Sequence, residues 1–107
     1  MQDKVPFNHC AEMLSALAAP ERLRVLRLLR DGPRSVGDMA AELGIALVNL
    51  SHHLTVLRHA GLVHKERQGR YILYSLPPGI LEGDDDKSGT EHINLGCCRL
   101  ELPRPEE

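Results

Sequence analysis

Three cysteines are the residues of this chain best suited to bind a ligand. Cys97 and Cys98 are adjacent near the C-terminal end, and Cys10 lies in the N-terminal region. Thiolates select soft ions, and three sulfurs match the pyramidal coordination of As(III) or Sb(III) without a leftover ligand. With His9 or His92 as a fourth donor, the same sulfurs would instead suit Zn, Cd or Cu(I). The cysteines therefore predict a thiolate site for a metalloid or soft metal ion.

Other interpretations of the cysteines remain open. Cys10 also fits the role of a small packed residue, because free cysteine is among the most buried residue types. Alternatively, Cys97 and Cys98 are a redox pair, in which a disulfide between the two neighbours or a persulfide shifts the C-terminal segment. An odd number of cysteines argues against a framework of structural disulfides. An enzyme is not expected, because the chain has no Cys-x-x-Cys motif, phosphate-binding glycine loop or strand–helix–strand pattern.

The second set of candidate residues lies on a helix predicted directly after Gly44. Steps of three and four residues separate Leu47, Leu50, Leu54 and Leu57, which predicts one buried stripe. The polar side chains fall elsewhere on this helix, and such a face is suited to read base edges in the DNA major groove. The DNA-binding residues predicted on it are Leu47, Val48, Asn49, Ser51, His52, His53, Thr55 and Arg58.

The segments on either side of this helix indicate a winged helix-turn-helix. A supporting helix is expected to begin at the S-x-x-D cap of Ser35 and Asp38 and to end at Gly44. After the reading helix, residues 62–76 predict a β-hairpin with Gln68 and Gly69 in its turn. Basic side chains on such a wing would grip phosphates beside the groove. The predicted wing contacts are Lys65, Arg67 and Arg70.

Two further helices are expected before this unit. Apolar spacing predicts the first over about 7–18 and the second from Pro20 to about Arg30. On the first helix, Phe7, Cys10, Ala11, Leu14 and Leu17 lie near one another in helical projection. The predicted fold class is therefore α+β, mainly α with one hairpin, in the order α-α-α-α-β-β.

Charge separates a basic centre from acidic ends. Between Pro20 and Leu76, nine Lys and Arg stand against five acids, a balance of +4, although the whole chain carries −2. This asymmetry is expected of a nucleic-acid binder. Aromatic residues make up 3%, so stacking on single-stranded bases is not expected. No apolar run approaches the ~20 residues that span a bilayer, and no signal-peptide core is present, so we expect a cytoplasmic protein without membrane contact.

Residues 14–76 resemble the arsenic-repressor (ArsR/SmtB) family of winged-helix metalloregulators. The resemblance rests on ALAAPERLRVLRLL, on the run SHHL-x-VLR-x-AGLV and on GRYILYSL, which are specific together. It implies a homodimeric repressor that binds a palindromic operator in double-stranded DNA and leaves it when an inducer ion or an oxidant occupies its site. It also implies that Asn49, Ser51, His52 and His53 lie on or beside the reading face.

The chain departs from the family pattern at three places. The reading helix begins Ala46-Leu47-Val48, where relatives commonly show Ser and Gln, so methyl or backbone contacts are expected to replace some base contacts. The family's thiol-rich site would fall on Ser35-Val36-Gly37, where no cysteine stands. After Leu76 the chain is rich in Pro, Gly and acids, so neither the long final dimer helix nor its metal site is expected.

These observations predict three parts. Residues 1–76 would form the DNA-binding domain, with a helix-turn-helix over about 36–60 and a first helix that carries the dimer contact. Residues 77–91 would form an acidic, flexible linker, and 92–107 a cysteine-containing tail that docks as an extended strand or irregular arm. A protein-interaction module without an inducer remains an alternative, because the reading helix begins with apolar residues.

Overall fold

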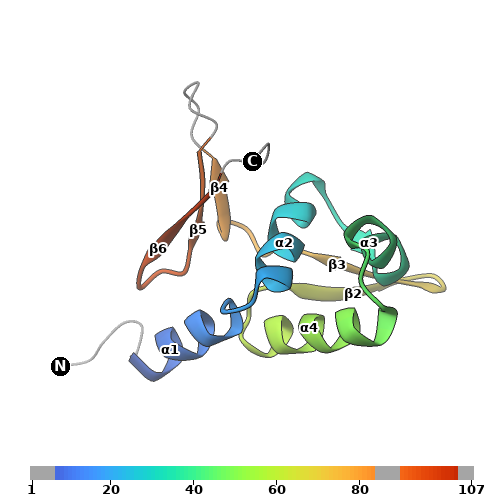
Figure 1. The fold of residues 1–107 in the computed structure, drawn as a ribbon, viewed down its shortest axis with the longest axis horizontal. Helices are drawn as coiled ribbons and strands as arrows, with labels where there is room; N and C mark the ends of the chain where they lie inside the picture. The colour runs from blue at the N-terminus through green and yellow to red at the C-terminus, as the bar shows by residue number, and fades with distance from the viewer. Residues whose placement is uncertain (1–6, 84–89, 104–107) are drawn as a thin grey trace.

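The computed structural model describes residues 7–83 and 90–103 (Figure 1). The elements are α1 (Phe7–Ala16), α2 (Pro20–Leu28), the 3-10 helix η1 (Leu29–Asp31), β1 (Arg34–Ser35), α3 (Val36–Leu43), α4 (Leu47–His59), β2 (His64–Gln68), β3 (Tyr71–Ser75), β4 (Leu81–Gly83), β5 (Glu91–Asn94) and β6 (Arg99–Leu102). They form two three-stranded sheets, β1-β3-β2 and β4-β5-β6, so the predicted α+β winged helix-turn-helix is confirmed.

Within the described ranges, no single helix is long and apolar enough to cross a membrane. Helices α3 and α4 would reach that length together, but the pair is bent by 113°.

The core of the winged helix is built around α4. Leu50, Leu54 and Leu57 have no exposed surface and pack in one cluster with apolar side chains of α2 and α3, such as Leu26 and Met39. This confirms three of the four residues of the predicted stripe. The prediction was wrong for Leu47, which is 54% exposed. Leu47 lies in the first turn of α4, where the helix has passed the edge of the core.

Local sequence explains the two helix ends of the helix-turn-helix. The Asp38 backbone N–H donates to Ser35 Oγ at 3.1 Å, as the S-x-x-D pattern predicts. Gly44 adopts a left-handed φ of 66° and closes α3. No side chain caps the first turn of α4, which follows Ala46. The backbone N–H groups of that turn therefore remain open toward an anion such as a phosphate.

The wing is the hairpin of β2 and β3. Gln68 pairs with Tyr71, so Gly69 and Arg70 form the loop, one residue later than predicted. Gly69 has a φ of 63°, as a tight hairpin turn requires. Strand β1 was not predicted, because two residues are too few to show alternation. It extends the wing into a sheet through the pair Arg34 and Tyr74.

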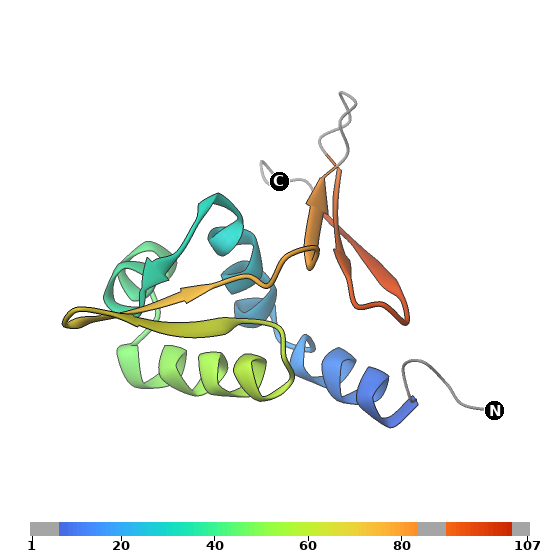
Figure 2. The ribbon, with the colours of Figure 1, turned by 180° about the vertical axis from the view of Figure 1, so that it is seen from behind.

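The C-terminal segment forms a second sheet, which lies beside α1 and α2 and away from the wing turn (Figures 1 and 2). Ile93 on the central strand pairs with Leu81 and Leu100 and has no exposed surface. Part of the predicted linker, β4, is thus a strand, because pairing with β5 satisfies its backbone. In the tail, β5 and β6 are paired strands, which is the first of the two conformations predicted for it and not the irregular arm. Residues 84–89 of the predicted acidic linker lie outside the described residues.

Candidate nucleic-acid interface and cysteine cluster

Helix α4 and the wing present most of the predicted DNA-binding side chains to solvent. The exposed ones are Leu47, Val48, Asn49, Ser51, His52, Thr55, Arg58, Lys65, Arg67 and Arg70. The first turn of α4 and the wing turn lie at the same end of the molecule in both views (Figures 1 and 2). No acidic residue occurs on α4. This arrangement would allow a helix to enter the major groove while a basic hairpin contacts the phosphates.

Two of the predicted DNA-binding side chains on α4 are also hydrogen-bonded within the protein. His53 is half-buried, and its Nδ1 accepts a hydrogen bond from Arg22 Nε at 3.1 Å. Arg22 donates in turn to the carbonyl of Ala16 at 3.3 Å, so the His53 ring is held by α2. Thr55 Oγ1 donates to the Ser51 carbonyl at 3.0 Å. These contacts leave less of His53 and Thr55 available to DNA than of their neighbours.

The three cysteines come together where α1 meets the turn between β5 and β6. Cys10 and Cys97 form a disulfide across 87 positions of sequence, with a Cα–Cα distance of 6.2 Å. The sulfur of Cys98, a free thiol, completes a group in which all three Sγ atoms lie within 4.8 Å of one another. The disulfide differs from the predicted redox alternative, which joins the neighbours Cys97 and Cys98. The sulfurs therefore link the first helix to the C-terminal sheet.

Neither candidate histidine joins this cluster. Among the residues that the structure describes, the group close enough to hold one ion contains the three cysteines only. His9 Nδ1 lies 3.7 Å from Glu12 Oε1 on the same helix. His92 Nε2 lies 3.6 Å from Glu82 Oε1, on the sheet face opposite buried Ile93, because successive residues of a strand point to opposite faces. The cluster is a three-sulfur group, which suits a pyramidal ion better than a tetrahedral one.

Helix α1 has one buried and one exposed apolar face. Met13 and Ala16 are buried in the core, as is Leu17 directly after the helix, whereas Phe7 is 82% and Leu14 39% exposed. Phe7 and Leu14 are two helical turns apart, so they lie on one side of α1. A large exposed phenylalanine and a leucine on one helix face are suited to contact another protein surface.

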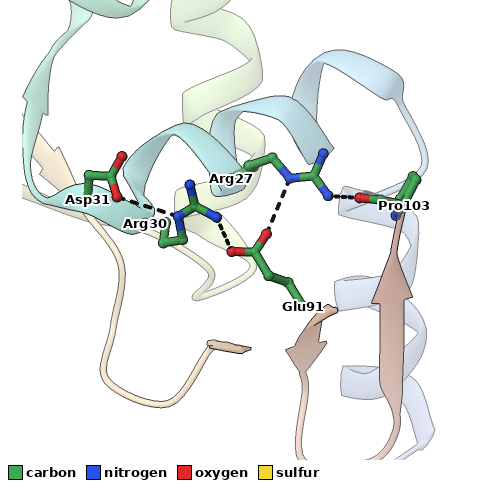
Figure 3. A network of polar contacts seen from close by, with 5 residues as sticks. All are labelled: Arg27, Arg30, Asp31, Glu91 and Pro103. Atoms are coloured by element: carbon green, nitrogen blue, oxygen red, sulfur yellow. Dashed lines mark hydrogen bonds and ion pairs between the residues drawn. The ribbon is translucent and has the colours of Figure 1, made fainter. Parts of the chain in front are cut away.

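A buried carboxylate provides a second connection between the C-terminal sheet and the winged helix (Figure 3). Glu91 on β5 is 7% exposed and accepts hydrogen bonds from Arg27 Nε at 3.3 Å and from Arg30 Nη1. Arg27 also donates to the carbonyl of Pro103, beyond β6. The hydrogen bond to Glu91 raises the pKa of the Arg30 guanidinium, which therefore stays charged. The C-terminal sheet is thus fastened to α1 by sulfur and to α2 and η1 by charge.

Glu91 was not predicted as a functional residue, because it falls at the end of the predicted flexible linker. A signal was present, because Glu91 occupies the buried register of the alternation Glu91, Ile93 and Leu95. An acid in a buried register requires a partner, and the four arginines between Arg22 and Arg30 were the candidates.

Replacing Glu91 with glutamine is expected to loosen the C-terminal sheet. The change removes the charge but keeps the shape, so about 1.5–3 kcal/mol of local stability would be lost, the range for hydrogen bonds to charged groups. The loss should stay in this range because Arg27 and Arg30 are partly exposed and regain water. Amide hydrogen exchange of Ile93 and Leu102 measures the effect. Glu101→Gln, an exposed control on β6, should leave exchange unchanged, and equal protection in E91Q and wild type would contradict the proposed fastening.

Comparison with known proteins agrees with this geometry. The family model described as bacterial regulatory protein, arsR family, matches residues 19–65. The HTH-type transcriptional regulator NmtR of Mycobacterium tuberculosis (strain ATCC 25618 / H37Rv) is 43% identical over 88 residues, which cover 80% of this chain and 73% of NmtR. The homodimeric winged helix-turn-helix DNA-binding domain of Mb0332 from Mycobacterium bovis is 34% identical with a TM-score of 0.63 and covers 65% of each chain. Reduced HlyU from Vibrio cholerae N16961 is 33% identical with a TM-score of 0.61, covering 65% of this chain and 74% of HlyU.

Proposed function

Because the chain belongs to the ArsR/SmtB family of DNA-binding transcriptional regulators, a non-enzymatic family, we propose that it is a homodimeric repressor released from its operator by a soft ion. The ion binds Cys10, Cys97 and Cys98. The observation that carries this proposal is the meeting of three sulfurs, from the two ends of the chain, within 4.8 Å of one another. Such a group is a ready trigonal ligand set once it is reduced.

The binding reaction is a condensation of thiols. A thiol reductant first supplies two electrons and two protons to the Cys10–Cys97 disulfide and is itself oxidised to a disulfide. Arsenous acid then reacts with the three cysteine thiols, so that three As–S bonds form and three molecules of water leave. The pyramidal product uses all three sulfurs and needs neither His9 nor His92.

The dimer contact would carry the signal from the cysteines to DNA. Phe7 and Leu14, exposed on α1, supply apolar surface for a second copy, and the related Mb0332 domain is a homodimer. In such a dimer the two α4 helices enter successive major grooves about one helical turn apart. An ion that ties Cys10 on α1 to the β5–β6 turn changes the position or mobility of α1 relative to α4. The ion releases DNA only if it binds the DNA-incompetent form more tightly.

A second candidate function, redox sensing, is favoured by the disulfide between Cys10 and Cys97. Glutathione disulfide would accept two electrons and two protons from these thiols, which leaves one protein disulfide and two molecules of glutathione. The new bond joins the same two elements as the ion would. Oxidation and ion binding are therefore two ways to fasten the C-terminal sheet to α1.

Operator release tests both functions. The reduced full chain is bound to a duplex selected from randomised DNA, and anisotropy is followed as arsenite, Cd(II), Zn(II), Cu(I) or glutathione disulfide is added. We expect arsenite to lower the affinity for DNA by about 5–150-fold, the usual range of allosteric coupling. Release by glutathione disulfide alone would favour the redox function. An affinity that none of these reagents changes would reject thiol sensing.

A further inference from the structure

The surface at the start of α4 is apolar although it faces solvent. Leu47 is 54% and Val48 76% exposed, whereas Leu50 in the next turn is completely buried. We call Leu47 and Val48 the apolar patch. These two side chains contribute little to the core, since both are largely exposed. The preceding residue, Ala46, has no side chain that could cap the helix. The patch is therefore available to a ligand.

The apolar patch borders polar side chains of α4 and lies at the wing end of the molecule. Ser51 and His52, three and four residues after Val48, continue the same exposed helix face. The first turn of α4 lies at the same end of the molecule as the wing turn, which carries Arg70 (Figures 1 and 2). The basic side chains of the wing complement the phosphates of DNA. A second copy of the chain fits less well here, because the positively charged side chains of the two wings would face and repel each other.

We propose that Leu47 and Val48 recognise the 5-methyl group of thymine in the major groove. The inference rests on the operator binding proposed above and names the chemistry of its specificity. The thymine methyl is the apolar group that the base pairs display in this groove, where the other groups are hydrogen-bond donors and acceptors. Neither Leu47 nor Val48 has a polar side-chain atom, so both distinguish base pairs through contact with this methyl group.

The apolar patch and its polar neighbours would then contact different base pairs of one half-site. Leu47 and Val48 contact a thymine methyl, and the Ser51 hydroxyl and the His52 ring supply hydrogen bonds to an adjacent base pair. In a dimer each half-site contains at least one such thymine. Removing a contacted methyl should weaken binding by about fourfold per half-site and about 15-fold for both, the ratio expected for one buried carbon group.

The test replaces thymine with uracil, which removes the methyl and leaves every hydrogen-bonding group in place. The full chain, kept reduced, first selects duplexes from a randomised library. Each thymine of the selected half-site is then changed to uracil in turn, and dissociation constants are measured at one salt concentration. A separate pair of duplexes carries cytosine or 5-methylcytosine at the sensitive position. We expect 5-methylcytosine to bind about fourfold more tightly than cytosine, since it restores the methyl.

Protein variants locate the contact. Leu47→Ala with Val48→Ala should bind thymine and uracil duplexes equally, and circular dichroism should show an intact fold, because both side chains are exposed. Ser51→Ala is the matched control, expected to weaken binding while it keeps the preference for thymine. Equal binding of thymine and uracil duplexes by the wild type, or a preference that survives in the alanine variant, overturns the inference and leaves operator binding standing. Failure to select any sequence-specific duplex overturns both.

Discussion

A variant with Cys97→Ser and Cys98→Ser is expected to bind the selected operator as tightly as the wild type and to stay bound in arsenite. The two substitutions leave one sulfur of the three-sulfur group, on α1, and one thiolate does not hold a pyramidal ion. The reading helix and the wing are untouched. A release of about 5–150-fold in the wild type should therefore fall below about twofold. Anisotropy titrations of labelled duplex with and without arsenite measure the ratio.

Single substitutions separate the two sensing functions. Cys98→Ser keeps the Cys10–Cys97 pair, so release by glutathione disulfide should persist while the response to arsenite weakens. Cys10→Ser should remove both responses, because it detaches α1 from the β5–β6 turn. Arg99→Ala is the matched control, since it changes an exposed residue beside Cys98 and keeps all three sulfurs. Release of the double serine variant by arsenite would reject the site.

The helix-turn-helix could be predicted because its signals are local. The cap at Ser35 and the left-handed turn at Gly44 are each determined within a few residues, and both are found in the structure. The stripe on α4 failed only at Leu47, because periodicity places a side chain on a face but does not show where along the helix the core ends. The error matters for function, because Leu47 is an exposed side chain on the predicted reading face.

The C-terminal sheet was less predictable because its contacts are distant in sequence. Strand β4 is three residues long and becomes a strand only through pairing with β5. Its own Pro- and Gly-rich surroundings indicate a loop. The residue types of the cysteine cluster could be read from the sequence, whereas the approach of Cys10 to Cys97 depends on how this sheet packs on α1. The same packing explains why Glu91, with partners 61 and 64 positions away, was missed.

The wing provides the second large effect. Replacing Arg67 and Arg70 with alanine is expected to weaken operator binding by about 100-fold or more at 0.1 M salt, because each protomer would lose two phosphate contacts. Both side chains are exposed, and Arg67 is held toward the turn by a hydrogen bond from Nη1 to the Gly69 carbonyl at 3.3 Å. Since these contacts carry no base information, all duplexes should weaken together and the preference among sequences should remain.

Salt dependence distinguishes this loss from damage to the fold. A dimer that loses four phosphate contacts should show a slope of log K against log salt that is smaller by about 3.6, at about 0.9 per contact. Arg99→Ala on the C-terminal sheet removes one exposed positive charge far from the wing turn and should leave the slope unchanged. An unchanged slope in the wing variant would mean that the hairpin does not touch the DNA backbone. In that case α4 alone would bind the groove, and the basic wing would act only through long-range attraction.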